Sequence, residues 1–193
     1  MTTNIARSEL ILGGQKSGKS RRAELLARVW LDASHQHRAV LIATAQPWDE
    51  EMRQRIVRHQ SDRAERVPGM TTVEEPLALA KAITRHSTAE TLVVVDCLTL
   101  WLTNQLMPAS SDSSSAEVML EYARVNTLLI AISSAPGPVI LVGNEIGLGV
   151  IPMGREVRAF VDALGRLNQD VAATCQRVTL MAAGLLIALK DIG

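Results

Sequence analysis

Residues 10–20 read Leu-Ile-Leu-Gly-Gly-Gln-Lys-Ser-Gly-Lys-Ser, an aliphatic run that ends in a glycine-rich loop. From Gly13 to Ser20 the stretch satisfies the pattern G-x-x-x-x-G-K-S, and a helix-like segment follows it. In a strand–loop–helix setting, glycines let successive backbone N–H groups turn inward around phosphate oxygens, and the helix start adds the positive end of its dipole. We therefore predict a phosphate loop that binds a nucleoside triphosphate. Lys19 would reach the β- and γ-phosphates, and the Ser20 hydroxyl would hold Mg²⁺. The alternative is a plain glycine-rich turn without a ligand.

Strand-like and helix-like segments alternate through the rest of the chain. Aliphatic runs that suit strands buried on both faces lie at 10–12, 39–43, 92–95, 139–142 and 178–182. Amphipathic stretches lie between them at 19–33, 49–60, 76–86, 116–134 and 155–175. Residues 71–74 suit a further short strand, and 185–190 suit an antiparallel edge strand. This order predicts an α/β fold, a three-layer P-loop NTPase-like sandwich with a mostly parallel sheet and an antiparallel C-terminal edge strand.

Composition limits the class of protein. A length of 193 residues suits a single domain over 1–193, and 20 Lys+Arg balance 20 Asp+Glu, which argues against binding to nucleic acid or anionic membranes. The two cysteines form no CxxC pair, no signal peptide is recognisable at the N-terminus, and no apolar run is long enough to span a bilayer. We expect a soluble, cytoplasmic protein. The serine-rich stretch 108–115 is predicted to be a surface loop.

Asp96 follows the aliphatic run 92–95, at the edge where such sheets bind ligands. We interpret Asp96 as the carboxylate that accepts a hydrogen bond from a Mg²⁺-bound water, and the alternative is that it caps a helix. The D-x-x-G and N-K-x-D signatures of regulatory GTPases are missing, because Asp96 is followed by Cys-Leu-Thr and Asn144 by Glu-Ile-Gly. A small-molecule kinase or nucleotidyltransferase is therefore favoured over a nucleotide-dependent switch.

His59 lies near the end of the predicted helix 49–60. From its position alone, a packed or capping histidine is the commoner role. Nearby arginines suit an anionic ligand and favour the neutral, nucleophilic imidazole; they are Arg55, Arg58 and Arg63. On a later predicted helix, a solvated or subunit-facing surface is slightly favoured for Arg166, Asn168 and Gln169.

Five segments in fixed order cover nearly the whole chain: LILGGQKSGKSRRAE, VLIATAQPWDEEMRQRIVRH, TTVEEP, VVVDCLTLWLTN and VGNEIGLGVIPMGREVRAFVDALGRLNQDVA. Together they resemble the bifunctional adenosylcobinamide kinase/adenosylcobinamide-phosphate guanylyltransferase family. The resemblance implies that ATP or GTP phosphorylates the hydroxyl on the aminopropanol arm of adenosylcobinamide. GMP then moves from GTP onto that phosphate and gives adenosylcobinamide-GDP during cobalamin nucleotide-loop assembly.

In this family the GMP travels on a histidine, and the matching position is His59. We expect His59 and Lys19 to be catalytic, Ser20 and Asp96 to bind the metal, and the chain to form a homotrimer. The nucleotide contacts implied by the resemblance fall on Gly13, Gly14, Gln15, Lys16, Ser17, Gly18, Lys19, Ser20, Thr44, Ala45, Gln46, Gln60, Ser61, Asp62, Arg63, Glu74 and Asp96. The alternative function is a P-loop kinase of another small hydroxylated metabolite, without guanylyl transfer and with His59 structural.

Overall fold

A seven-stranded sheet runs through the computed structural model, which describes residues 4–106, 115–150 and 152–192. Six strands are parallel, and β7 alone is antiparallel to its neighbour, in the order β3-β2-β4-β5-β1-β6-β7. The strands are β1 Ser8–Gly13, β2 Arg38–Ala43, β3 Met70–Glu74, β4 Thr91–Asp96, β5 Val139–Val142, β6 Arg177–Ala182 and β7 Leu185–Asp191. The predicted loop 108–115 lies outside the described residues except for Ser115, which begins a helix.

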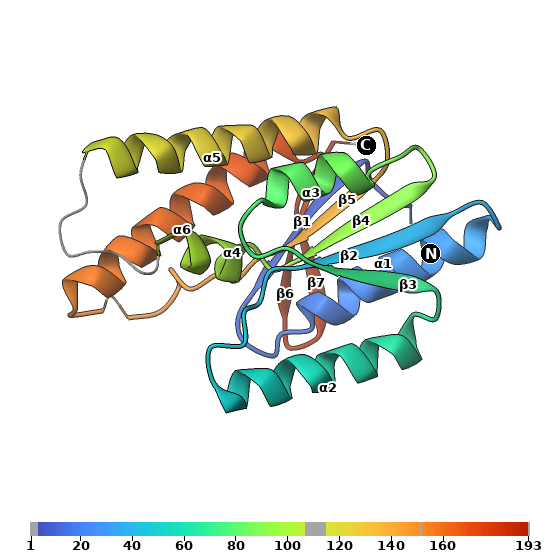
Figure 1. Ribbon diagram of the computed structural model, residues 1–193, viewed down its shortest axis with the longest axis horizontal. Helices are drawn as coiled ribbons and strands as arrows, with labels where there is room; N and C mark the ends of the chain where they lie inside the picture. The colour runs from blue at the N-terminus through green and yellow to red at the C-terminus, as the bar shows by residue number, and fades with distance from the viewer. Residues whose placement is uncertain (1–3, 107–114, 151, 193) are drawn as a thin grey trace.

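Helices cover both faces of the sheet (Figure 1). One face carries α3, α4, α5 and α6, and the other carries α1 and α2. The helices are α1 Lys19–Ala33, α2 Glu50–Arg66, α3 Leu79–His86, α4 Leu98–Leu106, α5 Ser115–Ser134 and α6 Arg155–Thr174. Within α2 and α5, the described side chains exclude those of Glu51, Met52, Arg55, Ile56, His59 and 115–121. Among the described helices, none combines the length and the apolar character that a bilayer crossing requires.

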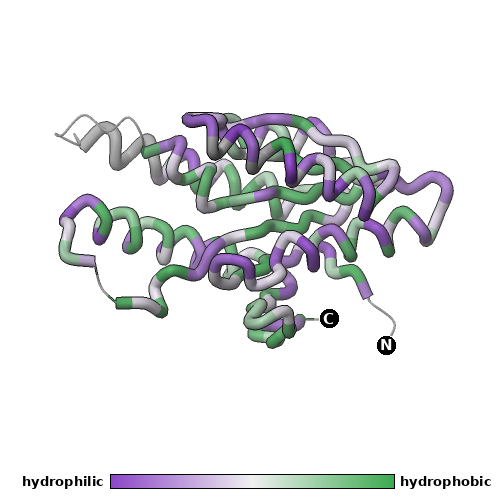
Figure 2. Tube along the Cα trace, turned by 90° about the horizontal axis from the view of Figure 1, so that it is seen from below, coloured by the Kyte–Doolittle hydropathy of each residue, from purple (hydrophilic) through white to green (hydrophobic). Residues whose placement is uncertain are grey.

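The strands divide their side chains between two cores, because successive residues of a strand point to opposite faces. In β1, Leu10 and Leu12 pack toward α3–α6, while Ile11 packs toward α1. In β4, Val93 and Val95 join the first core, and Leu92 and Val94 join the second. Most positions of a central strand are therefore apolar, although β1 also buries Ser8 and Glu9 at its start. Figure 2 shows this concentration of hydrophobic residues between the helical layers.

The predicted fold is confirmed, including the short strand β3 and the antiparallel edge strand β7. Two helices differ from the sequence prediction. The α2 helix continues to Arg66, six residues beyond the predicted end, and α4 was not predicted. The α4 sequence LTLWLTNQL mixes apolar and uncharged polar residues, and it buries Thr99 and Asn104 as well as Leu98, Trp101 and Leu102. None of its residues is exposed, so the sequence lacks the charged, solvated face that marks an amphipathic helix.

Candidate nucleotide-binding site

The phosphate loop connects β1 to α1 and is closed by its own hydrogen bonds. The Ser17 N–H donates to Gly14 O at 3.3 Å, and Lys19 Nζ donates to the same carbonyl at 2.6 Å. Lys16 and Gly18 adopt positive φ angles of 54° and 102°. These contacts of the chain with itself hold the loop in a curved conformation, so binding requires little further ordering of the loop.

Gly13 is required where β1 turns into this loop. A Cβ atom built there would lie 2.5 Å from the backbone oxygen of Met181 and 2.5 Å from Ser17 Oγ. Its φ of +154° is also one that L-residues rarely adopt. On the other side of the loop, the Gly184 N–H donates to Ser17 O at 3.0 Å. The turn between β6 and β7 therefore supports the loop from outside.

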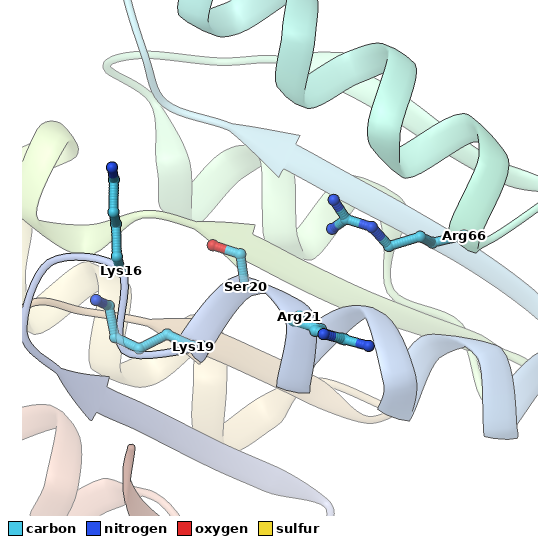
Figure 3. Close-up of a pocket in the computed structure, with 6 residues that line it drawn as sticks. Lys16, Lys19, Ser20, Arg21 and Arg66 are labelled. Carbon is cyan, nitrogen blue, oxygen red and sulfur yellow. The ribbon is translucent and has the colours of Figure 1, made fainter. Parts of the chain in front are cut away.

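A pocket of about 430 Å³ opens at this loop, and its lining is strongly cationic. Four of the six lining residues carry positive charge; the full set is Lys16, Gly18, Lys19, Ser20, Arg21 and Arg66. Figure 3 shows Arg66 extending from α2 across the start of α1. Lys19 is buried, at 8% exposure, and stands at the first position of α1. Positive side chains, inward loop amides and a helix N-terminus together favour an anion such as a polyphosphate.

Two arginines of α2 attach that helix to α1 through Glu24, a buried carboxylate. Arg66 Nη1 donates to Glu24 Oε2 at 2.7 Å, and Arg63 Nε lies 3.9 Å from Glu24 Oε1. The hydrogen bond to Glu24 raises the pKa of Arg66 above its usual value. The Arg63 side chain is buried and also brings Nη2 to 3.9 Å from Asp96 Oδ2. The phosphate loop helix, α2 and the end of β4 thus meet in one ionic cluster.

Asp96 lies at the carboxyl end of β4, with β5 between it and β1. Its carboxylate remains partly accessible, at 21% exposure. The Ser20 hydroxyl and the Asp96 carboxylate are hard oxygen donors of the kind Mg²⁺ prefers. No group of three or more His, Cys, Asp or Glu residues suited to a metal occurs within the described part of the chain. A Mg²⁺ ion bound with phosphates needs only one or two protein ligands, so this donor pair fits it.

Thr44 follows β2 and is completely buried. Its hydroxyl donates to Cys97 O at 2.7 Å and accepts from the Cys97 N–H at 2.9 Å. The Thr44 side chain therefore orients the segment after Asp96, and a direct nucleotide contact through it stays a prediction. Ala45 and Gln46, which follow Thr44, are half-buried.

The remaining predicted residues lie on α2 and at the end of β3. Gln60 Nε2 donates to Glu74 Oε1 at 3.4 Å, so these two positions are brought together. Ser61 is exposed, and Asp62 accepts from Arg66 at 3.0 Å. His59 is part of α2, one helical turn before Arg63, but its side chain lies outside the described residues. Its catalytic role stays a prediction.

The expectation for the α6 polar residues is wrong at one position. Arg166 and Gln169 are not buried, but Asn168 is 4% exposed and its Nδ2 donates to Asn144 O at 3.1 Å. Asn168 Oδ1 is buried without a hydrogen-bond partner. Asn168 therefore holds the segment that follows β5, next to the phosphate loop. The sequence pattern of a helix does not distinguish a buried polar residue from a solvated one. The distinction depends on which other segment of the same chain packs against the helix.

Sequence reasoning also missed Glu24 and Arg66. The signal for Arg66 was present in Pro68 and Gly69, which stop a helix at about residue 66 rather than 60. Glu24 gave no signal, because an acidic residue on an amphipathic helix is normally solvated.

A family model described as cobinamide kinase/cobinamide phosphate guanyltransferase matches residues 9–189. The chain belongs to this family. It is 45% identical over 183 residues to the bifunctional adenosylcobalamin biosynthesis protein CobP of Pseudomonas aeruginosa, covering 94% of this chain and 96% of that protein. It is 34% identical over 187 residues to CobU of Escherichia coli K12, covering 94% and 98%. Cobinamide kinase and cobinamide phosphate guanylyltransferase are thus the enzyme activities of the chain.

Two solved structures share the fold of this cobinamide kinase/guanyltransferase at low sequence identity. One of them, an ATPase domain, has a TM-score of 0.53 at 13% identity, covering 97% of this chain and 78% of that one. The flagellar accessory protein FlaH of Methanocaldococcus jannaschii has a TM-score of 0.52 at 12% identity, covering 98% and 81%. The fold class is that of P-loop ATPases.

Proposed function

We propose that both reactions of this enzyme use the single phosphate loop, with adenosylcobinamide as acceptor in the first and its phosphate as acceptor in the second. The observation that carries the proposal is the cationic pocket at the loop, lined by Lys19 and Ser20, with the partly exposed Asp96 linked to α1 through Arg63 and Glu24. The relatives in Pseudomonas aeruginosa and Escherichia coli are bifunctional adenosylcobalamin biosynthesis proteins, which supports placing both steps in cobalamin assembly.

In the kinase step, the cobinamide hydroxyl oxygen forms a bond to the γ-phosphorus of ATP or GTP. The bond from that phosphorus to the β–γ bridging oxygen breaks, the nucleoside diphosphate leaves, and the hydroxyl proton passes to solvent or a nearby base. Lys19 and the loop amides hold the β- and γ-phosphates, and Ser20 and Asp96 would hold Mg²⁺. When bound, Mg²⁺ neutralises charge on the phosphate oxygens.

In the guanylyl step, the same cradle holds the β- and γ-phosphates of GTP as the leaving group. An imidazole nitrogen of His59 bonds to the α-phosphorus, pyrophosphate departs, and the imidazole proton is lost. An oxygen of cobinamide phosphate then attacks the same phosphorus, the nitrogen–phosphorus bond breaks, and adenosylcobinamide-GDP forms. His59 lies on α2, which Arg63 and Arg66 attach to α1, the helix that follows the loop, and this position supports the role.

The two steps need different phosphorus atoms at the reaction centre. We infer that α2 shifts between them and that the Gln46-Pro47 turn, which precedes α2, is the hinge. An α2 helix that occupies one position in empty and GTP-bound crystals would contradict this inference.

Covalent labelling tests the proposed function. The purified enzyme is incubated with α-³²P-GTP and Mg²⁺, denatured and separated from free nucleotide. We expect acid-labile, base-stable label on wild-type protein and none on His59→Ala. Guanylyl transfer to cobinamide phosphate without label on the protein would instead contradict the histidine intermediate and leave His59 structural.

We further propose that residues 1–193 form one domain, that the enzyme is a cytoplasmic homotrimer, and that it neither binds nucleic acid nor inserts into a membrane. The one sheet that runs from Ser8 to Asp191 supports a single domain, and two buried free thiols suit a reducing compartment. Self-association is supported by the edge strand β7, where Leu185 is 71% exposed and Leu189 is 56% exposed. Sedimentation equilibrium of wild-type and Leu189→Lys protein tests the trimer, which we expect only for the wild type.

A further inference from the structure

The segment between β5 and α6 carries large apolar side chains exposed to water. Leu148 is 82% exposed, Val150 is 97% exposed and Met153 is 96% exposed, while Ile146 is 40% exposed. In Figure 2 the end of this segment stands out in the hydrophobic colour beside the start of α6. Exposed apolar clusters of this kind mark surfaces where an apolar partner binds.

Both ends of the segment are attached to the rest of the fold. The Glu145 N–H donates to Gly13 O at 3.1 Å, which ties the beginning of the segment to the phosphate loop. Glu145 Oε1 then accepts from the Gly147 N–H at 2.8 Å. At the other end, Arg158 of α6 donates to Pro152 O at 3.0 Å and to Met153 O. The exposed apolar side chains therefore lie on a segment whose first residues are hydrogen-bonded to the phosphate loop and whose last residues are hydrogen-bonded to α6.

The segment lies on the side of the phosphate loop where the terminal phosphate belongs. Because β5 stands between β1 and β4, residues after β5 lie between the phosphate loop and Asp96. A Mg²⁺-bound γ-phosphate points toward the metal carboxylate. Since a chain spans at most about 3.6 Å per residue, Leu148 lies within about 11 Å of Glu145. The exposed Leu185 of β7 lies on the other side of β1, away from Asp96.

Among the described residues, no large apolar side chain lines the nucleotide pocket, whose walls come from lysine, arginine, serine and glycine residues. The family description names cobinamide as the acceptor. Cobinamide is a wide corrin macrocycle that carries methyl groups, amide side chains and one hydroxyl-bearing arm. The macrocycle must therefore bind beside the pocket while its arm enters. We propose that Leu148 and Val150 form the apolar contact for one face of the corrin ring and so select the acceptor. This inference rests on the proposed function.

The test replaces both side chains in a Leu148→Ser/Val150→Ser variant. Its matched control is Ile130→Ser, an apolar residue of α5 that is 65% exposed. Equilibrium dialysis measures the Kd for adenosylcobinamide and for ATP, and a kinase assay measures KM for each substrate. We expect the double variant to raise the Kd and KM for adenosylcobinamide about tenfold, a loss of about 1.4 kcal/mol, with the values for ATP unchanged. The control keeps wild-type values for both.

Adenosylcobinamide affinity within twofold of wild type in the double variant would overturn the inference. So would a change in sedimentation of the double variant, because the segment would then be a contact between subunits. A wild-type enzyme that binds ATP but neither binds nor phosphorylates adenosylcobinamide would contradict the proposed function instead.

Discussion

Replacing Gly13 by alanine tests whether close packing at the end of β1 shapes the phosphate loop. The new Cβ would lie 2.5 Å from Met181 O and 2.5 Å from Ser17 Oγ. Met181 O belongs to β6, and Met181 is paired with Gly13 in the sheet, so it moves only if the pairing of β1 with β6 is disturbed. Ser17 lies in the loop, and displacing it opens the phosphate cradle.

The magnitude follows from two costs. A side chain forced to a positive φ costs about 1–3 kcal/mol, and overpacking a buried site costs about 1–3 kcal/mol. We expect the free energy of unfolding of Gly13→Ala to fall by about 3 kcal/mol, since part of the strain is shared. For a chain of this size the melting temperature then falls by roughly 6–12 °C.

Gly14→Ala is the matched control, because a Cβ at Gly14 meets no atom within 4 Å and Gly14 has no positive φ. Alanine there restricts the unfolded chain, so its stability should equal or slightly exceed that of wild type. Urea and thermal unfolding followed by circular dichroism measure the stability of both variants. Binding of a fluorescent ATP analogue reports whether the phosphate loop still holds a nucleotide. If Gly13→Ala unfolds at the same urea concentration as Gly14→Ala, the packing argument is refuted.

Lys19→Ala should lower both kinase and guanylyltransferase rates by about 10²–10³-fold, because both transition states lose the same cation; a rate assay with each acceptor checks this, and loss of only one activity would contradict the shared site. His59→Ala should abolish guanylyl transfer while kinase turnover persists, and an equal loss of both would make His59 structural. Burial raises the pKa of the Cys97 thiol to about 11 and that of Cys175 to about 12. Native protein should therefore resist iodoacetamide at pH 8 until denatured. Thiols of the unfolded chain ionise near pH 8.5, whereas the two buried thiols of the folded chain stay protonated at that pH. The free energy of unfolding should therefore fall as pH rises from about 9 toward 11, and urea titrations at several pH values would show this fall.

The strand order along the chain and the phosphate loop were predictable because each depends on local pattern. Continuous aliphatic runs identify strands covered on both faces, and α1 begins and ends at the predicted residues. The α4 helix was missed for the opposite reason: it is buried nearly all round, so its sequence resembles the strand run before it. The end of α2 was placed too early because its last turns are polar, which weakens the amphipathic period.

The partners of the charged residues were not predictable. Arg63 was expected to face a ligand, and it is buried between Glu24 and Asp96. Asn168 was expected at the surface, and it holds Asn144 beside the phosphate loop. In each case the side chain is separated from its partner by more than twenty residues in sequence, so only the folded chain brings the pair together.

The sequence by itself determined the phosphate loop, because glycines, a lysine and a serine at fixed spacing can be recognised without any neighbour. It determined the fold class through the alternation of strand and helix patterns, and the family through five segments in a fixed order. The tertiary structure alone decided how α2 is attached to α1 and β4, and which polar residues are buried. It also decided that the apolar segment after β5 is attached to the phosphate loop, through the hydrogen bond from the Glu145 N–H to Gly13 O. Those arrangements depend on contacts between residues that are far apart in the sequence and are brought together by the order of the strands in the sheet. A local pattern of residue types does not indicate which distant residues will be in contact.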